Sequence, residues 1–98
     1  MISALSLMII ARRYRVKGRV QGVGFRYFAL QAARRLGLVG IVKNMPDGTV
    51  EAVAEGAPAA LDQFRSELER GPDYSHVTAV DEVEMPPSGR YKNFDVSF

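Results

Sequence analysis

A short glycine-rich turn between two apolar patterns of different period most constrains the fold of this chain. From Arg12 to Val20 apolar and polar residues alternate, which is typical of a half-buried strand. From Phe25 to Leu36 the apolar residues recur at helical spacing, and Gly37 follows as a candidate left-handed stop. The turn between the two patterns reads Gln-Gly-Val-Gly. We therefore expect a strand that leads through a tight turn into a helix.

The same turn is a candidate anion site. Glycine permits left-handed backbone angles, so successive N–H groups can converge on one point. The first amides of the following helix have no intrahelical partner, and the helix dipole is positive at that end. Arg26 adds a planar, permanently charged fork that can hold two oxygens of a phosphoryl group. From the turn alone, the alternative is that the glycines only make the bend.

Further apolar patterns predict the rest of the fold. They indicate two strands, a helix and two more strands, at residues 39–45, 49–54, 58–70, 77–85 and 93–98. The first two strands form a hairpin across Pro46-Asp47-Gly48, and Gly71-Pro72 ends the helix.

The order of these elements predicts an α+β fold of the βαββαβ type. Two helices cover one face of an antiparallel sheet of four strands, with a short fifth strand if both segments after the second helix are paired. In the strand at 77–85 we expect Val77, either Ala79 or Val80, and Val83 to point inward.

Two motifs, taken together, are similar to those of a known family. Residues 18–26 read Gly-Arg-Val-Gln-Gly-Val-Gly-Phe-Arg, and Asn44 comes shortly before the Asp47-Gly48 turn. The chain resembles the acylphosphatase family in both motifs, in the order of the motifs and in the length of the chain. The likeness runs over residues 12–98.

This resemblance implies a ferredoxin-like fold and the hydrolysis of acyl phosphates to a carboxylate and inorganic phosphate. It also implies that Arg26 clamps the phosphoryl group and that Asn44 positions the attacking water. Backbone N–H groups would complete the site, with side chains mattering less there. Ile41 departs from the pattern, since many relatives carry tryptophan there, and this concerns packing more than chemistry. The phosphate-binding residues would be Gln21, Gly22, Val23, Gly24, Phe25 and Arg26.

Each of the two assigned side chains has a plainer alternative. Arg26 can be a surface arginine of the helix, and Asn44 can serve the hairpin turn at the end of its strand. An amide is nevertheless suited to orienting water, because it both accepts and donates hydrogen bonds without titrating.

The reaction needs little machinery, so we expect neither a cofactor nor a metal. A carboxylate whose pKa is about 4–5 leaves at neutral pH without protonation. The chain has no cysteine, and no His or carboxylate cluster has the spacing of metal ligands. His76, the single histidine, lies outside both motifs and is predicted to be structural. Ser75, Thr49 and Asp47 have no companion base.

Charge is unevenly distributed along the chain. Residues 1–48 hold nine Lys/Arg and one acidic residue, whereas residues 49–98 hold four Lys/Arg and ten acidic residues. The basic half contains the anion loop and would attract an anionic substrate. A nucleic-acid surface is the alternative for the arginine-rich stretch. No predicted strand carries the interleaved aromatic residues of an RNA-stacking sheet, so we expect no nucleic-acid partner.

Residues 1–11 precede the likeness, and we expect them to be an N-terminal extension or a lead-in to the first strand. Their apolar run is too short to span a bilayer, and its charges follow it, unlike those of a secretory signal. The alternatives are an extended strand, a frayed tail or an upstream start codon, with Met8 as the natural start.

The sequence thus predicts a small acylphosphatase-like domain at residues 12–98. We expect a cytoplasmic monomer without a membrane partner, since the absence of cysteine is compatible with a reducing compartment. The alternative function is a non-catalytic regulatory module that binds phosphate or carbamoyl phosphate. Asn44 argues against it, because a module that only binds could lack this residue.

Overall fold

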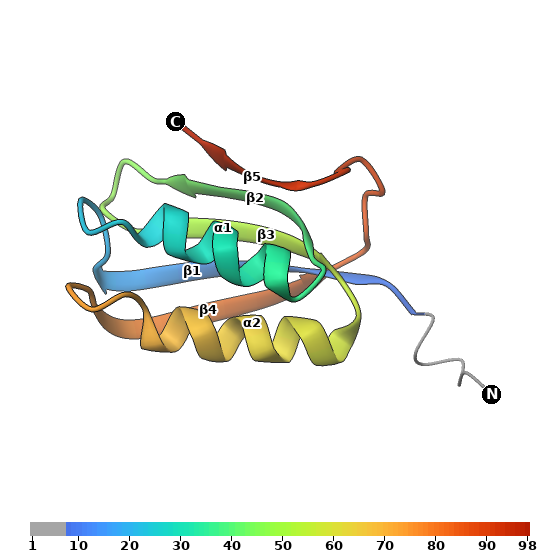
Figure 1. The fold of residues 1–98 in the computed structure, drawn as a ribbon, viewed down its shortest axis with the longest axis horizontal. Coiled ribbons are helices and arrows are strands. Elements are labelled where there is room, and N and C mark those ends of the chain that lie inside the picture. The colour runs from blue at the N-terminus through green and yellow to red at the C-terminus, as the bar shows by residue number, and fades with distance from the viewer. Residues whose placement is uncertain (1–7) are drawn as a thin grey trace.

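Within residues 8–98, which are those that the computed structural model describes, the chain folds into a five-stranded sheet with two helices on one face (Figure 1). The α+β fold expected from the sequence is therefore confirmed. In chain order the elements are β1 (Ile10–Arg19), α1 (Phe25–Arg35), β2 (Val39–Asn44), β3 (Val50–Gly56), α2 (Pro58–Arg70), β4 (His76–Met85) and β5 (Phe94–Ser97).

The sheet has the strand order β4-β1-β3-β2-β5. The pairs among β4, β1, β3 and β2 are antiparallel, as expected, whereas β5 pairs parallel with β2. Residues 86–93 carry the chain from the β4 edge to the opposite edge, where β5 lies beside β2 (Figure 1). An alternating apolar pattern identifies a strand but does not say which neighbour that strand takes, so the sequence did not reveal the parallel pair.

The core lies between the sheet and the helices. The fully buried ring of Tyr14 on β1 packs edge-on against Phe64 of α2, with ring centroids 5.5 Å apart, and Phe64 packs against Phe94 of β5 at 5.8 Å. The Tyr14 hydroxyl donates to the Leu61 carbonyl (3.0 Å), and burial raises the pKa of Tyr14 to about 12. This row of rings holds the sheet against the helix layer.

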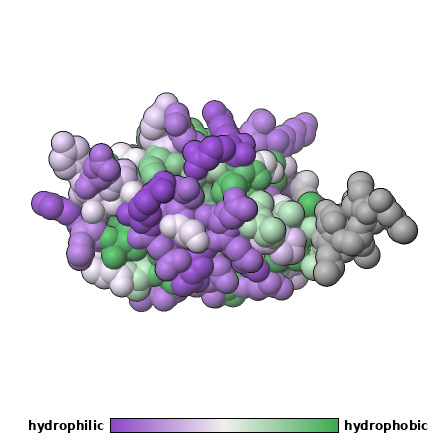
Figure 2. All heavy atoms as spheres, turned by 60° about the horizontal axis from the view of Figure 1, so that its bottom comes forward, coloured by the Kyte–Doolittle hydropathy of each residue, from purple (hydrophilic) through white to green (hydrophobic). Residues whose placement is uncertain are grey.

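The outer surface is mainly polar where Figure 2 shows it. Hydrophilic side chains dominate that face, and apolar residues form small separate patches. Among the helices of the described residues, none has the length and apolar character needed to cross a membrane.

β4 departs from its predicted inward pattern. Val80 is buried and Val77 is half-buried, whereas Ala79 is exposed and Val83 is 49% exposed. The prediction that Val83 points inward is wrong. Val83 pairs with Arg13, whose side chain is also exposed, and the β1–β4 register shifts at Lys17/Gly18. A bulge of this kind changes which residues of a strand face the core.

The predicted N-terminal segment is described only in part. Residues 1–7 lie outside the described residues. Met8 and Ile9 are exposed, and β1 begins at Ile10 rather than at Arg12.

Candidate active site

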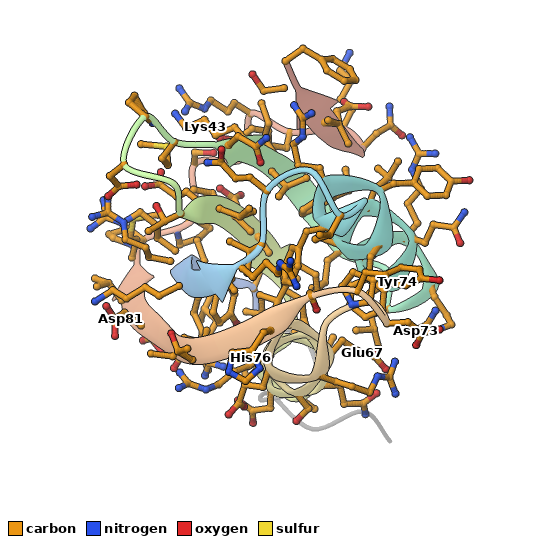
Figure 3. The ribbon with its side chains drawn as sticks, turned by 90° about the vertical axis from the view of Figure 1, so that its left-hand side faces the viewer. Lys43, Glu67, Asp73, Tyr74, His76 and Asp81 are labelled. Atoms are coloured by element: carbon orange, nitrogen blue, oxygen red, sulfur yellow. The ribbon has the colours of Figure 1, made fainter. Side chains whose placement is uncertain are left out.

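The β1–α1 loop, the β2–β3 hairpin and the end of β5 lie at one end of the sheet, at the left of Figure 1 and toward the viewer in Figure 3. A hollow of about 200 Å³ opens among them, and we refer to it as the site hollow. It brings together the two side chains expected to be catalytic. The site hollow is lined by Val20, Gly22, Gly24, Phe25, Arg26, Tyr27, Asn44, Val96 and Phe98.

The loop before α1, residues 21–24, leaves the helix start open, and we call it the cradle loop. Gly22 and Gly24 have left-handed φ angles of 73° and 78°, and a Cβ at either would meet nothing within 4 Å. These glycines are therefore required by backbone angle rather than by space. Gly24 is the N-cap of α1, makes no side-chain capping bond, and accepts from the N–H of Phe28 (3.0 Å). The N–H groups of residues 21–27 have no backbone acceptor within residues 8–98, so an anion can take them.

Arg26 is half-buried in the first turn of α1, and β5 holds it at the site hollow. Its Nη1 donates to the carbonyl oxygen of Ser97 (3.1 Å), and its guanidinium carbon lies 4.9 Å from the centroid of the Phe98 ring. It forms no ion pair within residues 8–98. Arg26 is therefore not an unconstrained surface arginine, because β5 orients its side chain. Its remaining N–H donors are free.

Asn44 ends β2, and the hairpin turn that follows does not use its side chain. The N–H of Gly48 donates to the Met45 carbonyl (3.1 Å), and the Asp47 carboxylate accepts from the hydroxyl and the N–H of Thr49 (2.6 and 3.0 Å). These bonds from Thr49 lower the pKa of Asp47. The Asn44 carboxamide makes no hydrogen bond within the described part of the chain, so it is free to bind water or an anion.

The side chain of Gln21 has a role that the sequence did not indicate. Its Nε2 donates to the carbonyl oxygens of Met45 (2.8 Å) and Thr49 (2.9 Å), and so ties the cradle loop to the hairpin that carries Asn44. The expectation that side chains in this loop matter little does not hold for Gln21. Unlike the four other residues expected to bind phosphate, Gln21 and Val23 do not line the site hollow.

The end of β5 also contributes residues that sequence reasoning missed. Val96 and Phe98 line the site hollow, and Ser97 holds Arg26. The alternation of Phe94, Val96 and Phe98 predicted a strand. Only the parallel pairing, in which Ser97 lies opposite Lys43 of β2, brings that strand beside Asn44.

Other candidate residues lie outside the site hollow. His76 is exposed at the start of β4, and β1 separates it from the β2–β3 hairpin (Figure 3). The Ser75 hydroxyl donates to the carbonyl of Pro72 (2.6 Å). Within the part of the chain that the structure describes, no group of three or more His, Cys, Asp or Glu residues could hold a metal ion.

Some of the charges on β1 are paired with acidic side chains, unlike that of Arg26 on α1. Arg15 lies 3.3 Å from a Glu51 oxygen, and Lys17 lies 2.9 Å from an Asp81 oxygen. Basic residues of the first half of the chain thus meet acidic residues of the second half across the sheet. The charge asymmetry of the sequence is partly neutralised in the fold, and the positive charge of Arg26 remains at the hollow.

The molecule is therefore an α+β domain in which an open helix start, an oriented arginine and a free amide line one hollow, and such donors suit an anion. The acylphosphatase family model matches residues 12–96. An acylphosphatase of Archaeoglobus fulgidus is 44% identical over 90 residues, which is 92% of this chain and 100% of that protein. One from Thermus thermophilus is 51% identical over 81 residues, 83% of this chain and 91% of that protein.

Solved structures agree with these sequence relatives. The crystal structure of an acylphosphatase from Bacillus subtilis has a TM-score of 0.87 and 40% identity, with 93% of this chain and 100% of that chain covered. This chain belongs to the acylphosphatase family.

Proposed function

We propose that Arg26 and Asn44 carry out the hydrolysis of acyl phosphates in the site hollow, while the cradle loop and the start of α1 hold the phosphoryl group. The reaction follows from membership of the acylphosphatase family: an acyl phosphate and water give a carboxylate and inorganic phosphate. The roles of the residues are our proposal. One observation carries it, namely that a single hollow is lined by the open helix start, Arg26 and Asn44.

The phosphoryl group would be held by donors that are already in place. Left-handed Gly22 and Gly24 turn the backbone so that N–H groups of the loop and helix start are unpaired. Arg26 is oriented by its hydrogen bond to the Ser97 carbonyl, and its remaining N–H groups can donate to two oxygens of the phosphoryl group. Donors fixed in this way stabilise the charge on the equatorial oxygens of the transferring group without reorganising during the reaction.

Asn44 would place the attacking water in line with the leaving carboxylate. Its carbonyl oxygen accepts from the water, and its NH₂ donates to the water or to a phosphoryl oxygen. The new bond joins the water oxygen to phosphorus, the bond from phosphorus to the acyl oxygen breaks, and both protons of the water stay with the phosphate product. The carboxylate needs no acid, since its pKa is about 4–5. The hairpin turn does not use the Asn44 side chain, which leaves its carboxamide free for this role.

The experiment is a hydrolysis assay with benzoyl phosphate in EDTA, with p-nitrophenyl phosphate as the phosphomonoester control. We expect turnover of benzoyl phosphate alone. Asn44→Ala should lower kcat by about 10²-fold or more, as loss of a transition-state contact does. The inhibition constant of inorganic phosphate should stay nearly unchanged in this variant.

Asn93→Ala is the matched control, because Asn93 is exposed and precedes β5, away from the hollow. It should retain wild-type kcat. Full turnover in Asn44→Ala, or loss of phosphate inhibition with kcat retained, contradicts the role given to Asn44.

The proposal keeps the wider expectations from the sequence: a metal-independent, monomeric, cytoplasmic enzyme without a nucleic-acid partner. Inorganic phosphate and sulfate should inhibit competitively, because they present the same oxygens to the cradle loop as the substrate. Inhibition that is noncompetitive, or activity that EDTA abolishes, contradicts this description.

A further inference from the structure

One side of the site hollow is apolar, and phosphate binding does not account for it. We infer that the acyl group lies against the rings of Tyr27 and Phe98, and that the enzyme therefore favours acyl phosphates with an aromatic or bulky apolar acyl group. This inference rests on the proposed function. Val20 and Val96 line the same hollow and extend the apolar wall.

Phe98 lies directly beside the group that is proposed to clamp phosphorus. Its ring is 4.9 Å from the Arg26 guanidinium carbon, and the preceding carbonyl, of Ser97, accepts from Arg26. In an acyl phosphate only one bridging oxygen separates phosphorus from the acyl carbon. A phosphoryl group held by Arg26 must therefore place its acyl group next to the clamp, within reach of the Phe98 ring.

Tyr27 supplies a second ring at the mouth of the hollow. It follows Arg26 on α1, and its hydroxyl accepts from Nε2 of Gln31 (2.7 Å), which orients the ring along the helix. Tyr27 is 63% exposed and Phe98 is fully exposed. Both rings leave apolar surface in water, and an apolar acyl group would cover this surface when it binds.

A neighbouring hollow of about 400 Å³, lined by residues of α1 and α2, offers the acyl group a competing direction. It shares Gly24 and Tyr27 with the site hollow. Glu67, labelled in Figure 3, also lines it and pairs there with Arg35 (3.4 Å) and with Arg70. An apolar group placed there would take these charges out of water, which is costly. The side of the site hollow that Phe98 lines is the more favourable one.

The experiment compares benzoyl phosphate with acetyl phosphate by the ratio of their kcat/KM values. We expect Phe98→Ala and Tyr27→Ala each to lower the benzoyl-to-acetyl ratio by about five- to tenfold, as loss of one ring contact of roughly 40–50 Å² would. Tyr27→Phe keeps the ring and should keep the ratio. Tyr74→Ala is the matched control, since Tyr74 is an exposed aromatic (83%) that lines neither hollow.

A ratio that Phe98→Ala and Tyr27→Ala leave unchanged overturns the inference, even if both rates fall, because Phe98 would then only position Arg26. If Arg70→Ala changes the benzoyl-to-acetyl ratio and the two ring variants do not, the acyl group lies in the hollow between α1 and α2 and the inference is wrong. Wild-type enzyme that hydrolyses neither substrate contradicts the proposed function rather than the inference.

A binding measurement tests the inference without turnover. Phenylphosphonate and methylphosphonate present the same anion with and without a ring. We expect wild-type protein to bind phenylphosphonate more tightly, and Phe98→Ala to reduce that preference by about the same five- to tenfold. Equal affinity of wild-type protein for the two phosphonates overturns the inference.

Discussion

Arg26 and Glu55 lie toward opposite ends of the sheet and show two ways in which this small fold places a charge. Glu55, near the end of β3, is only 4% exposed, and its carboxylate accepts from the N–H and the hydroxyl of Ser88 (3.0 and 2.7 Å) and from the N–H of Gly89 (3.1 Å). Arg26 is half-buried and, within residues 8–98, has one side-chain hydrogen bond, to the Ser97 carbonyl.

The difference separates a structural charge from one that is available to a ligand. Burial opposes the ionisation of Glu55, but the hydrogen bonds from Ser88 and Gly89 outweigh it and lower its pKa below the ordinary value. All of that favourable interaction is used within the protein, where it fixes the β4–β5 connection to β3. The unused donors of Arg26 are instead available to a ligand, which in our proposal is a phosphoryl group.

The largest expected effect is that of Arg26→Lys, which keeps the positive charge and removes the planar fork. We expect kcat/KM to fall by about 10²–10³-fold, or roughly 3–4 kcal/mol of transition-state stabilisation, because an ammonium cannot make two parallel N–H···O bonds. The assay is benzoyl phosphate hydrolysis, with melting followed by circular dichroism.

Arg34→Lys is the matched control for this variant. Arg34 lies on the same helix and also donates to a β5 carbonyl, that of Phe94 (3.2 Å), but it does not line the site hollow. It should retain near wild-type activity. If folded Arg26→Lys has near-normal kcat and KM, the site needs only a positive charge at this position, and the proposed pair of parallel N–H···O bonds is wrong.

At the opposite end, Glu55→Gln should affect stability rather than catalysis. The amide places a donor against a backbone N–H, so we expect a loss of about 1–3 kcal/mol in the free energy of unfolding. Urea unfolding of the two proteins measures this loss. Activity at low temperature should be unchanged, because Glu55 does not line the site hollow.

The effect of Glu55→Gln should also depend on pH. The folded-state pKa of Glu55 is lowered, so its contribution is present above the unfolded pKa, ordinarily about 4.3, and is lost as the pH falls through the folded value. The difference in stability between wild type and variant should therefore shrink in acid. Glu69→Gln is the control, as Glu69 is exposed. A difference that does not change with pH contradicts the ionised, hydrogen-bonded carboxylate.

The smallest of these effects is expected from Gln21→Ala. Like Glu55, Gln21 uses its hydrogen bonds within the protein, but like Arg26 it lies at the site. Losing its bonds to Met45 and Thr49 should cost about 1–2 kcal/mol of stability. It should lower kcat by about tenfold, since the cradle loop and Asn44 are then less well aligned. Gln63→Ala, at an exposed position of α2, should change neither. A stability loss with unchanged kcat would make Gln21 purely structural.

The sequence predicted what depends on neighbouring residues. Periodicity located β1 and α1, and the Pro46-Asp47-Gly48 turn located the hairpin, since these features depend on local backbone preferences. The glycines and Arg26 identified the loop and the helix start for the same reason. The family resemblance added Asn44, and the fold then placed Asn44 and Arg26 in one hollow.

What the sequence did not predict depends on pairings between distant segments. The parallel partner of β5 decides that Ser97 and Phe98 meet Arg26, and no residue of β5 signals that partner. The tether from Gln21 likewise needs a hairpin that closes much later in the chain. The exposure of Val83 follows from a register shift between β1 and β4, which an alternating pattern does not reveal.

The uncapped start of α1 has a thermodynamic consequence for the whole protein. Gly24 caps the helix with no side-chain bond, so the helix start lacks the acceptor that a Ser, Thr, Asp or Asn side chain would provide, which is worth about a few tenths of a kcal/mol relative to glycine. A bound phosphate would supply that interaction in the folded state only, because the unfolded chain has no such site. Ligand occupancy and folding are therefore linked, and the melting temperature should rise with phosphate concentration. By the same linkage, this domain is least stable when it has neither substrate nor product to bind.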